Sequence, residues 1–152
     1  MVQRYLRGLM KKVKAITPVL FHVTAGNSSQ QNPFLMRVIL HPHCTQMDFA
    51  YQAPKKYVRG GWIRIAAYTH LRVKGDSKRY ALIEAKGIPI APNQLDFEST
   101  ADWQYFSLYF EPLPKKDLVF DMLEEEKPAP TDFNFYDIKI DWSQGIPVLF
   151  EK

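Results

Sequence analysis

From residue 32 onward, hydrophobic and polar residues alternate with a period of two, as expected for β-strands with one buried face. The clearest example is segment 104–110, whose two faces consist of Phe106, Leu108 and Phe110, and of Tyr105, Ser107 and Tyr109. We expect the first three residues to lie in the core together with Ile63 and Ile65. Similar runs predict strands at residues 34–40, 47–51, 62–65, 71–73, 80–85, 118–123 and 133–140.

Turn-forming residues separate these strands. Pro112 and Pro114 end segment 104–110, because proline cannot donate to a ladder, and Gly75 lies in a turn that predicts a hairpin. In segment 34–40 the alternation places Phe34 and Met36 on the same face as Val38 and Leu40. About eight short strands with no helix among them are typical of an all-β fold, either a two-sheet sandwich or a barrel.

Residues 1–31 follow a different pattern. Apolar residues recur every three or four positions from Val2 to Ile16, with basic residues between them, and Pro18 ends the run. One interpretation is a short basic amphipathic helix that packs on the domain. The other is an export signal with its cleavage region at residues 24–26. We therefore divide the chain into a basic segment at 1–31, a β domain at 32–142 and a C-terminal tail at 143–152.

The 152-residue chain carries a net charge of +4 that is unevenly distributed. Residues 1–47 contain no Asp or Glu, whereas residues 87–152 contain thirteen acidic and five basic residues. If these charges stay separate in the fold, one face would attract anions. The single cysteine, Cys44, excludes an intrachain disulfide, and the sequence has no run of about 18 apolar residues that would predict a membrane-spanning helix.

The cluster His41-Pro42-His43-Cys44 is the sharpest candidate for chemistry, since imidazole and thiolate are ligands for zinc and copper. Its spacing matches no standard structural zinc motif, however, and Pro42 favours a polar turn between two strands. A nucleophilic Cys44 would also need a base, which only His41 or His43 could supply nearby. We expect no catalytic residue, no metal and no cofactor.

Aromatic residues of segment 104–110 are the first candidates for binding. Trp103, Tyr105 and Tyr109 are expected on its outer face. Exposed rings are typical of surfaces that contact other proteins or sugars. The alternative is that the N-terminal segment covers them.

A basic connection at Lys55, Lys56 and Arg59 is the second candidate for binding. It lies near aromatic residues such as Tyr57 and Trp62, and nucleic-acid binders combine cations with aromatic platforms. Solvated strand faces and turn tips give the same pattern. We therefore favour a protein partner over nucleic acid.

Several short motifs occur in a characteristic order: Asn32-Pro-Phe34, Gly61-Trp-Ile-Arg-Ile65, Thr69-His-Leu71, Lys78-Arg-Tyr-Ala-Leu82, Ala85-Lys-Gly-Ile-Pro89, Phe106-Ser-Leu-Tyr-Phe-Glu-Pro-Leu-Pro114 and Phe120-Asp121. This set resembles an uncharacterised extracytoplasmic domain of Bacteroidetes-type bacteria that often precedes a thioredoxin-like domain. The resemblance covers residues 32–140. It implies an immunoglobulin-like two-sheet sandwich, a periplasmic or cell-envelope location and no catalytic residues.

Together, these features predict a non-enzymatic accessory or protein-interaction module of the bacterial envelope. One alternative is a binder of anionic ligands or nucleic acid through the basic half of the chain. Another is a metal or thiol site at residues 41–44. A cytoplasmic location is the alternative to export.

Overall fold

The computed structural model describes residues 17–23, 25–28, 32–55, 59–100, 102–124 and 132–148. Within these ranges there is one turn of 3-10 helix, η1 (Trp142–Gln144), and no helix that could span a bilayer. Each of the predicted strands has a counterpart, so the all-β prediction is confirmed. The strands are β1 (Val19–Phe21), β2 (Asn27–Ser28), β3 (Phe34–Leu40), β4 (Thr45–Gln52), β5 (Trp62–Ile63), β6 (His70–Val73), β7 (Tyr80–Lys86), β8 (Leu95–Asp96), β9 (Trp103–Phe110), β10 (Leu118–Leu123), β11 (Phe135–Ile140) and β12 (Ile146–Pro147).

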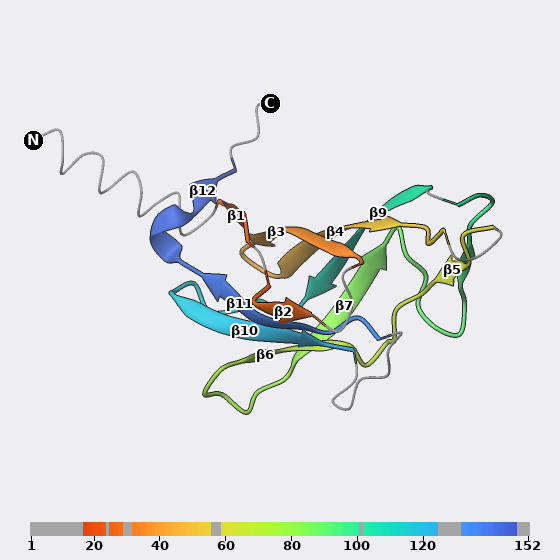
Figure 1. Cartoon of the computed structure of the whole chain (residues 1–152). Helices are drawn as coiled ribbons and strands as arrows, with labels where there is room; N and C mark the ends of the chain where they lie inside the picture. Colours follow the sequence, from red (N-terminus) through yellow and green to blue (C-terminus); the bar gives the residue numbers. More distant parts are fainter. Residues whose placement is uncertain are drawn as a thin grey trace, which may run out of the picture.

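Ten of these strands form one continuous antiparallel sheet in the order β12-β1-β3-β4-β9-β7-β6-β10-β11-β2, while β5 and β8 form a separate pair. Strand β7 pairs with β9 on one side and with β6 on the other. The sheet curves, so that β3, β4 and β9 lie across the core from β10 and β11 (Figure 1). The expected division into two separate sheets is not observed among the described strands, because β7 forms hydrogen bonds with both β9 and β6 and so joins the two halves.

The core fills the space between the two halves of this sheet. The three residues predicted to point inward from β9 are at most 4% exposed, as are Ile63 and Ile65. The ring of Phe49 on β4 packs against Phe106 on β9, with 5.0 Å between centroids, and against Phe135 on β11 at 5.4 Å. Aromatic contacts across the core thus hold the two halves together.

The sheet extends beyond the domain limits expected at residues 32 and 142. Strand β1 pairs with β3 and with β12, so residues outside both limits belong to the sheet. Val19 and Phe21 are buried, and a Cβ atom at Gly145 would lie 2.5 Å from Val19 Cγ1. Runs of two and three residues are too short to reveal a period, which is why these strands were not predicted. The basic segment before residue 17 lies outside the described residues.

Strand β3 contains an irregularity that changes which of its residues face outward. Its pairing with β4 skips Met36, an extra residue in a β-bulge between Leu35 and Arg37. An extra residue reverses the alternation of inward and outward positions on one side of the bulge. Phe34 and Met36 are therefore 55% and 45% exposed, while the second half of the strand is buried. The common face predicted for this strand is wrong at these two positions.

Candidate functional site

Three aromatic rings lie next to one another on the outer face of the sheet, and we call Phe34, Trp103 and Tyr105 the aromatic strip. These residues are 55%, 48% and 64% exposed. The centroids of Phe34 and Trp103 are 6.4 Å apart, and those of Trp103 and Tyr105 are 6.5 Å apart. The corresponding ring planes meet at 28° and 13°. Contiguous exposed rings of this kind are characteristic of surfaces that bind a partner.

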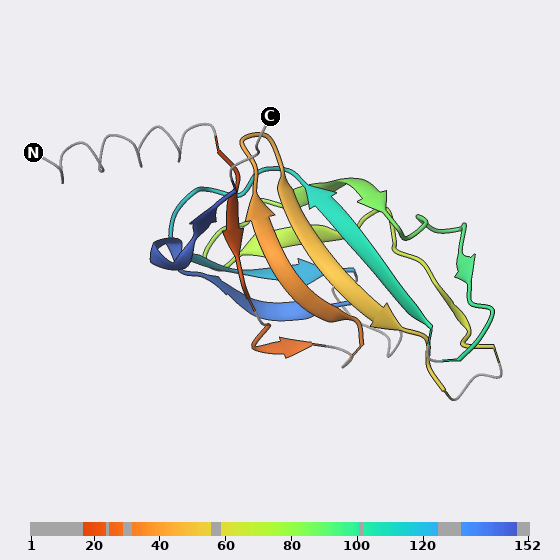
Figure 2. The same ribbon diagram turned by 90° about the horizontal axis from the view of Figure 1, so that it is seen from above.

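The register of three neighbouring strands brings these rings together. Strands β3, β4 and β9 run side by side in Figure 2. Ala50 of β4 is paired with Phe34 on one side and with Tyr105 on the other, and Gln52 is paired with Trp103. The small side chain of Ala50 leaves the space above β4 to the larger rings. The strip therefore depends on the alternation in β9 and on the bulge in β3.

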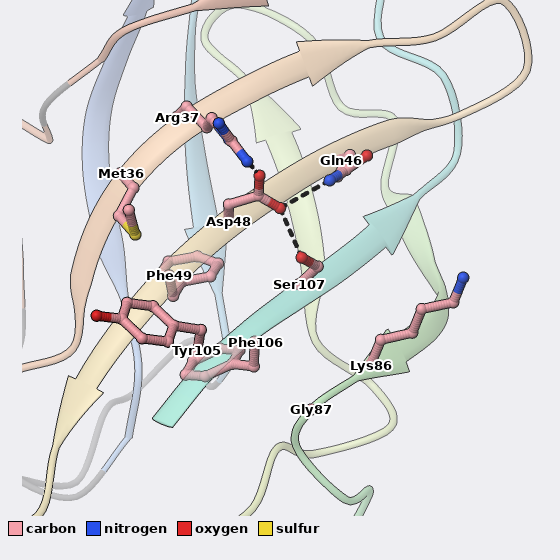
Figure 3. Close-up of a pocket in the computed structure, with 10 residues that line it drawn as sticks. All are labelled: Met36, Arg37, Gln46, Asp48, Phe49, Lys86, Gly87, Tyr105, Phe106 and Ser107. Carbon is pink, nitrogen blue, oxygen red and sulfur yellow. Dashed lines mark hydrogen bonds and ion pairs between the residues drawn. The ribbon is translucent and has the colours of Figure 1, made fainter. Parts of the chain in front are cut away.

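A depression of about 420 Å³ adjoins the aromatic strip on the same face. Met36 and Tyr105 line it on the side of the strip, and Figure 3 shows the Tyr105 side chain reaching across β4 towards Met36. The rest of the lining includes five polar residues, Arg37, Gln46, Asp48, Lys86 and Ser107. Apolar and charged groups thus meet in one shallow site.

Asp48 is the centre of a hydrogen-bond network in this depression (Figure 3). Its Oδ2 lies 2.5 Å from Arg37 Nε, and its Oδ1 accepts hydrogen bonds from Ser107 Oγ at 2.6 Å and from Gln46 Nε2 at 2.8 Å. Burial by itself raises the pKa of this carboxyl group. The hydrogen bonds from Ser107, Arg37 and Gln46 outweigh burial, so the pKa lies below its ordinary value. Asp48 is therefore ionised at neutral pH, with its charge satisfied by protein donors.

Tyr109, which was predicted alongside Trp103 and Tyr105, is separate from the strip. It is half-buried on β9, beyond Ser107, and its ring lies 5.1 Å from the ammonium group of Lys86. This cation–π contact holds Lys86 beside the depression. The structure thus brings together two of the three predicted aromatic residues and adds Phe34, which was not predicted.

The cluster at residues 41–44 forms the tight connection between β3 and β4, with His41 N donating to Cys44 O at 2.9 Å. His41 Nε2 lies 2.7 Å from Gln46 Oε1, so its ring extends the network around Asp48, whereas His43 is exposed. Burial, followed by the charge of Glu84, raises the pKa of the Cys44 thiol, which disfavours the reactive thiolate. Within the described part of the chain, no three His, Cys, Asp or Glu side chains converge as a metal site requires.

The basic connection leaves the sheet close to one end of the aromatic strip. Gln52, the last residue of β4, pairs with Trp103, and Lys55 follows three positions later. Lys55 and Arg59 are both exposed, whereas Lys56 lies outside the described residues. This connection therefore contributes positive charge near the strip.

The polar network was not predicted from the sequence, because it depends on residues far apart along the chain. The contact between Arg37 and Asp48 spans 11 positions, and that between Asp48 and Ser107 spans 59. Such pairs become neighbours only through the register of β3, β4 and β9. The alternation of Met47, Phe49 and Tyr51 with Asp48 and Ala50 separates the two faces of this strand, but it carries no information about partners on other strands.

No protein-family model, curated protein or solved structure matches this chain. The geometry of the outer face and the resemblance of the sequence motifs are therefore the two guides to its function.

Proposed function

We propose that this protein is a non-enzymatic interaction module whose aromatic strip contacts another protein. The observation that carries the proposal is the contiguous exposure of Phe34, Trp103 and Tyr105. Covering the exposed half of such a ring contributes roughly 2 kcal/mol. A few anchors of this size supply most of the affinity in many protein interfaces.

The state of the nearby reactive groups supports a role in binding rather than catalysis. Catalysis requires a nucleophile with a base in reach, a pair of carboxyl groups with separated pKa values, or a metal. Cys44 is half-buried with a raised pKa, and the Asp48 carboxylate accepts hydrogen bonds from three protein donors. Neither arrangement activates a group towards a substrate.

Site-specific photocrosslinking tests this proposal. A photoreactive phenylalanine analogue replaces Tyr105 in the full chain, which is expressed in its native cell. The matched control places the same analogue at Tyr68, because Tyr68 and Tyr105 are both 64% exposed. We expect a discrete protein adduct from position 105 only, and we expect it to disappear when Trp103→Ala is added.

The complementary control is Trp62→Ala, since Trp62 on β5 is 47% exposed and Trp103 is 48% exposed. It should leave the adduct at position 105 unchanged. Identical adducts from positions 68 and 105, or no adduct from position 105, would contradict the proposal. Circular dichroism melts of each variant separate loss of contact from loss of fold.

The family resemblance supports two finer assignments. We infer an immunoglobulin-like arrangement for the curved sheet and a periplasmic or envelope location. Fractionation of native cells tests the location. Recovery with the periplasm or the envelope supports it, and recovery with the cytoplasm contradicts it.

A further inference from the structure

The charge that the depression presents to a ligand is mainly positive. The Asp48 side chain is only 10% exposed and already accepts hydrogen bonds from three protein groups. The Arg37 side chain is 46% exposed and contacts Asp48 through Nε, and its terminal amino groups meet no further acceptor within the part of the chain that the structure describes. Guanidinium groups bind carboxylates through two parallel hydrogen bonds.

Lys86 supplies a second cation to the same site. Figure 3 shows Arg37 and Lys86 on opposite sides of Asp48 and Ser107, with Tyr105 of the aromatic strip to one side. A carboxylate seated between these two cations would place the adjoining part of a ligand near Tyr105. Lys55 is also exposed, and it follows Gln52, the partner of Trp103, by three positions.

The same face disfavours a densely charged polyanion. Glu84 on β7 is exposed and is paired with Tyr109, and Asp48 itself lines the depression. A nucleic acid carries a phosphate at every nucleotide and binds to rows of cations. Separate cations beside an apolar strip instead suit a ligand with isolated carboxylates and apolar groups between them.

We propose that the partner presents an acidic peptide segment in which Asp or Glu side chains alternate with aromatic or aliphatic ones. This inference rests on the proposed function and specifies its ligand. One carboxylate binds between Arg37 and Lys86, and the apolar side chains pack on the aromatic strip. Electrostatic attraction then orients the segment, while burial of the rings supplies most of the affinity.

Selection from a display library of random short peptides tests this proposal with the full chain as bait. We expect wild type to enrich peptides that combine acidic and aromatic residues. We expect Lys86→Glu to weaken binding of the selected peptides by about tenfold or more. Lys78→Glu is the matched control, because both lysines are exposed over a tyrosine ring, at 4.7 Å for Lys78 and 5.1 Å for Lys86. It should leave the selected peptides bound.

The outcomes separate this inference from the proposed function. Enrichment of apolar peptides without acidic residues, lost in Trp103→Ala/Tyr105→Ala but not in Lys86→Glu, would overturn the inference and leave the interaction module standing. Failure to enrich any peptide whose binding needs the strip would overturn both. Binding of polygalacturonate oligomers in place of acidic peptides, again dependent on the strip, would replace the peptide with an acidic glycan.

Discussion

Glu124 offers the sharpest test of how this fold is held together. It is 7% exposed and directly follows β10, and its carboxylate accepts hydrogen bonds from Ala66 N at 2.9 Å and from Phe133 N at 3.0 Å. Its own backbone N–H donates to Asn134 Oδ1 at 2.8 Å. One side chain therefore connects the segment between β5 and β6 with the start of β11.

We predict that Glu124→Gln lowers the free energy of unfolding by about 1–3 kcal/mol. A glutamine amide has a single acceptor oxygen, so one of the two backbone N–H groups would face the NH₂ group and lose its hydrogen bond. Glu124→Ala removes both acceptors and should cost about 2–6 kcal/mol by the same reasoning. In Glu124→Gln, part of the lost stability is offset, because the substitution also removes the cost of burying a charge.

The dependence on pH gives a second measurement. Burial raises the pKa of Glu124 despite the hydrogen bonds from Phe133 and Ala66. The folded protein therefore binds this proton more tightly than the unfolded chain, and the contribution of Glu124 to stability increases as pH falls through the raised folded pKa. The difference in free energy of unfolding between wild type and Glu124→Gln should therefore increase as pH falls from neutral towards the ordinary Glu pKa of about 4.3.

Denaturant unfolding at several pH values measures both effects. Glu98→Gln, at an exposed carboxylate, is the control and should change stability by less than about 0.5 kcal/mol. If Glu124→Gln is as stable as this control at neutral pH with an unchanged denaturant slope, the two hydrogen bonds do not stabilise the fold as predicted. A gap that narrows on acidification would show that hydrogen bonding, and not burial, dominates at this carboxyl group.

Three other substitutions test the core, the edge and the outer face by the same unfolding assay. Leu108→Ala, at a fully buried position of β9, should cost about 2–5 kcal/mol, whereas Ile83→Ala, at a residue 58% exposed, should cost much less. Phe21→Ala should cost about 3–5 kcal/mol because β1 belongs to the sheet. A negligible cost would show that the stable domain begins at residue 32, as the sequence predicted. Asp48→Asn should destabilise at neutral pH by about 1–3 kcal/mol. Because the pKa of Asp48 is lowered, the difference in stability between wild type and Asp48→Asn should disappear as pH falls below the ordinary Asp pKa of about 3.9 and through the folded pKa. A difference in stability that does not change with pH would contradict an ionised Asp48.

The sequence was sufficient to predict eight of the twelve described strands, because their signal is local. In β9, three inward residues alternate with outward ones, and burial against the opposite half of the sheet reinforces that period. Strands β1 and β12 carry no such signal, since their lengths of three and two residues cannot show a period. Their place in the sheet depends on pairing with each other and, for β1, with β3.

Glu124 shows why charge runs are poor guides to burial. It begins the sequence Glu124-Glu125-Glu126, and such runs are usually hydrated. In the fold, two backbone N–H groups from distant segments nevertheless donate hydrogen bonds to its buried carboxylate. Compensation of this kind depends on tertiary contacts, so no local pattern of residues could have indicated it.

The aromatic strip combines a feature that the sequence predicts with one that it conceals. Trp103 and Tyr105 face outward because β9 alternates regularly, and the sequence alone predicts this. Phe34 joins them because the bulge at Met36 reverses the alternation of inward and outward positions in the first part of β3. Without that extra residue, Phe34 would turn inward and the strip would contain two rings. An irregularity in the backbone thus widens the surface that we propose as the binding face, which accords with the frequent occurrence of bulges at functional sites.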